Sequence, residues 1–133
     1  MRRLLQTAFC IVSLLSCVAC FAQNAVALRV QGVGYAARGD YASAAPHLAQ
    51  AAELGYYVAQ IEYAVLLDTS PPPVNDNIKA FAWYSLVIAR NGTDTDFAEE
   101  RRALVAQRLD AEATQQASQL ASELVAKYGQ PAE

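Results

Sequence analysis

The fold is decided by the stretch from Leu28 to Ala89, whose first half, from Leu28 to Gly55, reads LRVQGVGYAARGDYASAAPHLAQAAELG. Spacings of four and three residues place one large, one small and one aromatic side chain on a single helical stripe, namely Leu28, Gly32 and Tyr35. A comparable stripe, Ala44, Leu48 and Ala51, follows the turn at Gly39-Asp40. Because small residues facing large ones let two helices approach closely, the stretch predicts an antiparallel helical hairpin.

The rest of the chain is expected to be helical as well, since no run of residues alternates as a strand would. Helices are predicted at about residues 24–38, 41–54, 58–68, 77–90 and 110–128, with a further one beginning at 94–96. The Gly39-Asp40 pair is expected to supply a turn and an N-cap between the first two helices. Pro46 allows either a late start of the second helix, with Ser43 as its N-cap, or a bend at the proline, and we expect the late start. The helix at 77–90 is apolar on nearly every face, so Trp83 is expected in the core and the last helix is expected to cover it. Asp96 and Glu99 resemble a capping box, and the arginines that follow them predict a solvated helix.

The second half of the stretch carries an ordered set of residues, Gly55, Ala59-Gln60, Asp76, Lys79-Ala80 and Trp83-Tyr84. This set resembles a Sel-one-like repeat, and the first hairpin resembles the related tetratricopeptide repeat. The resemblance implies an all-α fold, a short α-solenoid of antiparallel helix hairpins. Its expected parts are a hairpin at 24–54, a second at 55–92, a capping helix pair at 93–129 and a tail at 130–133.

The first 22 residues have the layout of a secretory signal peptide: two arginines, an uncharged apolar run and an end of small residues. Ordinary cleavage after Ala22 gives a periplasmic or secreted protein. Two alternatives stay open. Leu14-Leu15-Ser16-Cys17 resembles a bacterial lipobox, which would make Cys17 a lipidation site, and an uncleaved leader would be a membrane anchor.

The composition argues against several classes of function. The formal net charge is −3 and becomes more negative if Arg2 and Arg3 leave with the leader, which argues against nucleic acid and anionic membranes as partners. All three cysteines lie in the leader, so no disulfide is expected in the folded domain. His47 is the only histidine, and no catalytic set, metal cluster or cofactor motif is recognisable. We therefore expect no enzyme, no metal and no cofactor.

The function predicted from the resemblance is that of an exported interaction module that binds a protein or peptide. A partner groove is predicted from helices one and three, at Arg29, Val33, Ala36, Ile61, Val65 and Asp68, with Val26 and Val58 beside them. Arg29 and Asp68 are expected at its rim. The alternative for these residues is ordinary core. The alternatives for the function are a lipid-anchored structural envelope lipoprotein and an enzyme or inhibitor of unrecognised chemistry.

Overall fold

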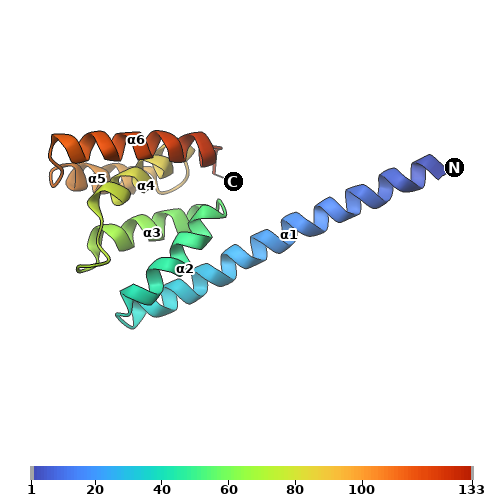
Figure 1. Ribbon diagram of the computed structural model, residues 1–133, viewed down its shortest axis with the longest axis horizontal. Helices are drawn as coiled ribbons and strands as arrows, with labels where there is room; N and C mark the ends of the chain where they lie inside the picture. The colour runs from blue at the N-terminus through green and yellow to red at the C-terminus, as the bar shows by residue number, and fades with distance from the viewer. Residues whose placement is uncertain (1, 133) are drawn as a thin grey trace.

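The chain is built from α-helices in the computed structural model, which describes the backbone of residues 2–132 and the side chains of residues 20–132. The helices are α1 (Arg2–Ala37), α2 (Tyr41–Glu53), α3 (Tyr57–Thr69), α4 (Asn77–Arg90), α5 (Thr95–Ala106) and α6 (Ala111–Tyr128). No strand occurs within residues 2–132, which confirms the predicted all-α class. Helix α1 projects well beyond the others, which gather at its C-terminal end (Figure 1). Among the described residues, no helix is both long and apolar enough to cross a lipid bilayer.

Helices α1 and α2 pack as the small and large residues of the opening stretch predict. Leu48 is buried beside Gly32, where a Cβ atom would lie only 2.7 Å from the Leu48 Cγ. The turn between the helices uses Gly39 at a φ of +78°, a conformation that side chains disfavour. This close contact leaves room for nothing larger than glycine at position 32.

The predicted late start of α2 at Ser43 is wrong. The N-cap is Asp40, whose Oδ1 accepts a hydrogen bond from the Ser43 amide at 3.1 Å, so Pro46 lies inside the helix. The start at Tyr41 is favoured because the Asp40 side chain then accepts a hydrogen bond from the Ser43 amide, which has no partner within the first turn of the helix. Pro46 removes one helical hydrogen bond, but its ring lies on the exposed side of α2.

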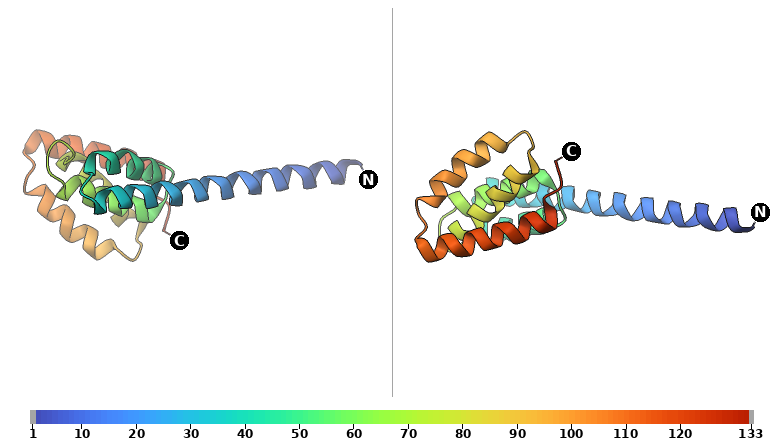
Figure 2. Two further views of the ribbon diagram at one scale, coloured as in Figure 1. Left: turned by 90° about the horizontal axis from the view of Figure 1, so that it is seen from below. Right: turned by 90° about the horizontal axis from the view of Figure 1, so that it is seen from above.

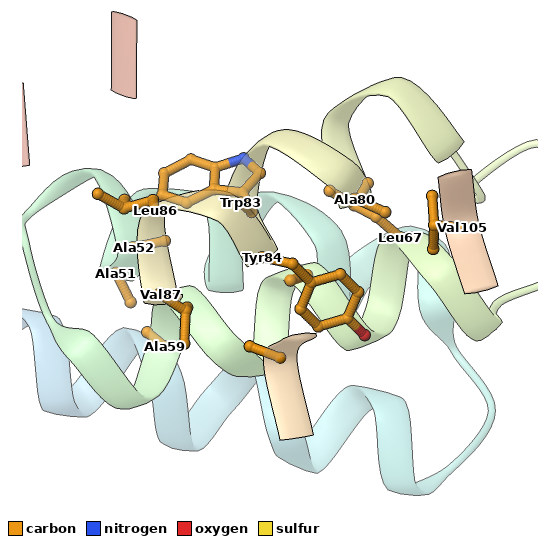
Figure 3. Close-up of a cluster of buried hydrophobic side chains, with 12 residues drawn as sticks. Ala51, Ala52, Ala59, Leu67, Ala80, Trp83, Tyr84, Leu86, Val87 and Val105 are labelled. Carbon is orange, nitrogen blue, oxygen red and sulfur yellow. The ribbon is translucent and has the colours of Figure 1, made fainter. Parts of the chain in front are cut away.

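Helix α4 is the central helix, because it packs against α3, α5 and α6. Its buried residues include Trp83, which is 4% exposed, and Tyr84, which is fully buried, so the prediction of a core tryptophan is confirmed. Figure 3 shows these two rings on different sides of α4, among side chains from α2, α3 and α5. Helix α6 covers α4 through the small residues Ala117 and Ala121, as predicted.

In the link from α4 to α5, the residue in the left-handed conformation is Asn91, with a φ of +50°. Gly92 is needed for space, since a Cβ there would clash with the ring of Tyr57. The start of α5 differs from the prediction. Helix α5 begins after Asp94, so Asp96 lies inside the first turn and forms no capping box.

The two α1 glycines give a matched test of this packing. We expect Gly32→Ala to lower the free energy of unfolding, because overlap with Leu48 costs about 1–3 kcal/mol and exceeds the gain of about 1 kcal/mol in helix propensity. Gly34→Ala should raise it by up to about 1 kcal/mol, since its new Cβ meets only the flexible end of Arg38 at 3.7 Å. Urea unfolding followed by circular dichroism measures both. Equal effects at the two positions would contradict the tight α1–α2 contact.

Candidate functional site

Ion pairs join helix α3 to α1 and to α5. Arg29 of α1 donates to both carboxylate oxygens of Glu62, with its Nε 2.8 Å from Oε2. Both side chains are about one-quarter to one-third exposed, at 31% and 26%. The hydrogen bond to Glu62 raises the pKa of Arg29. This two-point contact fixes α1 against α3.

Helix α3 also presents Asp68, whose carboxylate is fully buried. Its Oδ2 accepts from the Arg101 Nε at 2.8 Å and from the Tyr84 hydroxyl at 3.1 Å, and its Oδ1 accepts from the Arg108 Nη1 at 2.7 Å. Burial alone would raise the pKa of Asp68, but the hydrogen bonds from Arg101 and Arg108 outweigh it and hold the pKa below its ordinary value. Burial, together with the Asp68 charge, raises the pKa of Tyr84. The carboxylate of Asp68 is therefore ionised, and its hydrogen bonds join α3 to α4 and to α5 with the turn that follows it.

The ion-paired residues are flanked by apolar side chains in the same way on each odd-numbered helix. On α1, Val26 and Val33 lie three and four positions from Arg29. On α3, Val58 and Val65 lie four and three positions from Glu62, and on α5, Phe97 and Leu104 lie four and three positions from Arg101. Such spacings place side chains on one face of a helix. Except for the half-buried Val65, these apolar residues are exposed. We call these nine residues together the odd-helix face; they are Val26, Arg29, Val33, Val58, Glu62, Val65, Phe97, Arg101 and Leu104. The ion pairs Arg29–Glu62 and Arg101–Asp68 link the three helices that carry them.

The structure divides the predicted groove residues into exposed and packed ones. Val33 is 37% exposed and Arg29 lies beside it, whereas Ala36 is half-buried against the Ala44–Leu48 cluster. Ile61 and Val65 are half-buried against the main core. Asp68 was expected at an exposed rim, and this is wrong, because Arg101 and Arg108 cover its carboxylate. Only part of the predicted set is thus available to a partner.

Sequence reasoning missed the residues that α5 contributes. The arginines at 101 and 108 were expected in a solvated helix, but both reach back to Asp68. Arg101 lies three and four positions from the buried Ala98 and Val105, which places it at the edge of the buried face of α5, whereas Arg108 follows the end of the helix. Neither spacing names Asp68 as the partner.

The histidine and the cysteines considered for a chemical role make ordinary structural contacts, are exposed, or have side chains outside the described residues. The centre of the His47 ring lies 5.2 Å from that of Tyr35, with the two rings tilted by 40°, and its Nδ1 lies 2.8 Å from the Ser43 carbonyl oxygen. No group of three histidine, cysteine or carboxylate side chains that could hold a metal occurs among the described residues. Cys20 is exposed. The side chain of Cys17 lies outside the described residues.

No family model matches the chain, and comparisons with curated proteins and with solved structures find no similar protein.

The Asp68 cluster predicts a specific stability change. We expect Asp68→Asn to lower the free energy of unfolding by about 2–4 kcal/mol, since it leaves two arginines without their counter-ion, although both remain partly exposed. Glu62→Gln, the control on the half-exposed pair, should cost about 1 kcal/mol or less. Denaturant unfolding measures both changes.

The same variant should change the dependence of stability on pH. Because the folded-state pKa of Asp68 is lowered, its contribution is fully present above its unfolded pKa of about 4 and is lost as the pH falls through the folded value. The stability difference between the wild type and Asp68→Asn should therefore shrink below about pH 4. A constant difference from pH 7 to pH 2 would contradict the assigned role of this carboxylate.

Proposed function

We propose that this chain is a helical-repeat interaction module whose odd-helix face binds a protein or peptide segment. The observation that carries the proposal is the repeated pattern of exposed apolar side chains around ion-paired residues on α1, α3 and α5. Val26, Val33, Val58, Phe97 and Leu104 are between 36% and 43% exposed. Apolar side chains that gather on one face of a small protein commonly mark an interaction site.

The order of helix contacts supports a short α-solenoid of hairpins like the one that the resemblance implies. Helix α1 packs on α2, and α3 packs on α4. Ion pairs then connect α1 to α3 and α3 to α5, while α5 and α6 each pack on α4. In an array of hairpins the first helices form one continuous surface, and we propose that the odd-helix face is the corresponding surface here.

The residues that carry the resemblance to a Sel-one-like repeat also have contacts that hold hairpins together. Gln60 is fully buried; its Nε2 donates to the Ala52 carbonyl at 3.1 Å and its Oε1 accepts from Arg90 at 2.8 Å. Asp76 caps α4 by accepting from the Lys79 amide at 3.0 Å. These contacts support the proposed relation to Sel-one-like repeats, because they explain physically why those residue types are needed at these positions.

The chemistry of the face favours a partner with apolar side chains. Arg29 and Glu62 neutralise each other, and Arg101 is paired with Asp68, so the face offers little unpaired charge to attract a charged partner. We therefore propose that recognition rests on burial of the valine, phenylalanine and leucine side chains. Arg29 and Glu62, which keep some exposure, would orient the partner.

We further propose that the protein is exported and has no catalytic chemistry. The first buried side chain of α1 among residues 20–132 is Ala25. Removal of the leader after Ala22 would therefore leave every described buried side chain in place, so the fold is compatible with cleavage at that point. A lipid anchor at Cys17 is the alternative.

Site-specific photo-crosslinking in the producing cell tests the interaction site. A benzoylphenylalanine at Val33, Val58 or Phe97 should give adducts with one shared partner, because these positions lie on the odd-helix face. The same group at Leu54 or Ala89, which are exposed elsewhere, should not give that adduct. Mass spectrometry of the adducts identifies the partner. The same adduct from all five positions, or none from the first three, would contradict the proposal.

A substitution then separates binding from folding. Val33→Glu should abolish the adduct formed at Val58 and leave the melting temperature nearly unchanged, since position 33 is exposed. Ile61→Glu is less informative, because the half-buried Ile61 contacts the core and a charge there would weaken the fold itself.

A further inference from the structure

Helices α5 and α6 both pack on α4 but diverge from each other, as the right-hand view of Figure 2 shows. A cleft of about 560 Å³ lies between them. Phe81 and Ser85 of α4 and Arg102 of α5 line it on one side. The α6 side is made of small and apolar residues, namely Ser118, Ala121, Ser122, Val125 and Ala126. This cleft is separate from the odd-helix face.

Arg102 differs from the other half-buried arginines in having no carboxylate or carbonyl acceptor within the described residues. Arg29 is paired with Glu62, Arg101 with Asp68, and Arg90 donates to Gln60 and to backbone carbonyls. The Arg102 guanidinium carbon lies 5.6 Å from the centre of the Phe81 ring, and Nη1 makes one long contact of 3.3 Å to the Ser85 Oγ. Most of its five N–H donors therefore remain available.

The described residues that line the cleft supply no counter-charge to Arg102, which is the only charged residue among them. The serine hydroxyls donate to carbonyls of their own helices, Ser85 to Phe81 and Ser122 to Ser118. Their hydroxyl protons are thus already used, and they offer only acceptor lone pairs. The cleft combines one cation that has no carboxylate partner among the described residues with a mainly apolar lining.

From this combination we propose that the cleft binds a small monocarboxylate with an apolar body. A carboxylate matches the planar donors of a guanidinium, and a partly desolvated arginine gains more from such a pair than an exposed one. The apolar body would lie along Phe81, Ala121 and Val125. The cleft volume falls within the range of small-molecule sites, about 300–1,000 Å³.

Titration of the full chain with octanoate, followed by NMR of methyl groups and of the arginine Nε–H, tests this proposal. Octanoate should shift the signals of Val125, Ala121 and Arg102 first. Octanol, with the same apolar body and no charge, should bind at least about tenfold more weakly, as expected for the loss of a charge-assisted hydrogen bond. Octylammonium should leave these signals unchanged.

Matched variants connect the binding to Arg102. Arg102→Met should weaken octanoate binding at least about tenfold and leave octanol binding unchanged. Arg38→Met is the control, because Arg38 also lies over an aromatic ring, 5.0 Å from the centre of Tyr35, but outside the cleft. If Arg102→Met fails to fold, Ser118→Trp gives the second test: it fills the cleft from an exposed position and should remove octanoate binding. Octanoate binding that survives Ser118→Trp or Arg102→Met, or that shifts signals elsewhere only, would overturn the proposal.

Discussion

The buried carboxylate of Asp68 is the interaction on which the arrangement of the helices depends most. A charge without access to water is tolerated only where hydrogen bonds and opposite charges surround it. Here Tyr84 of α4, Arg101 of α5 and Arg108 just after α5 supply them. The need to compensate this one charge therefore constrains the positions of α3, α4 and α5 together.

Helix α5 relies on this interaction more than the other helices do. Its buried apolar residues are only Ala98 and Val105, two small side chains that provide little hydrophobic stabilisation. Helix α4, by contrast, buries Trp83, Tyr84, Leu86 and Val87. We infer that Asp68 holds α5 in place, and with it the exposed side chains of Phe97 and Leu104. In this way a buried polar contact positions exposed apolar side chains.

The local features of the fold could be predicted because they follow from residue spacing. The close approach at Gly32, the central position of Trp83 and the cover that α6 provides all come from one-dimensional patterns that repeat every three to four residues. The exposed valines at 33 and 58 were also predicted as part of an interaction surface. For Ile61 and Val65 the sequence left both a groove and ordinary core open, because their burial depends on how deeply α3 lies between its neighbours.

The Asp68 cluster could not be predicted, for a physical reason. Its partners lie 33 and 40 residues away in sequence, and no local spacing encodes such a contact. Acidic residues at the start of a helix and basic residues towards its end interact favourably with the helix dipole. This local effect already explained the arginines of α5, so there was no reason in the sequence to look for a distant partner. The start of α2 was mispredicted in the same way, since Pro46 outweighed the cap that Asp40 provides.

Hydrogen exchange in the Asp68→Asn variant tests the central claim most directly. If Asp68 holds α5 in place, amides of α5, residues 95–106, should exchange much faster in the variant than in the wild type, while those of α2, residues 41–53, change little. Peptide-resolved mass spectrometry measures both segments in one experiment. Unchanged protection of α5, or an equal loss in α2 and α5, would contradict this account.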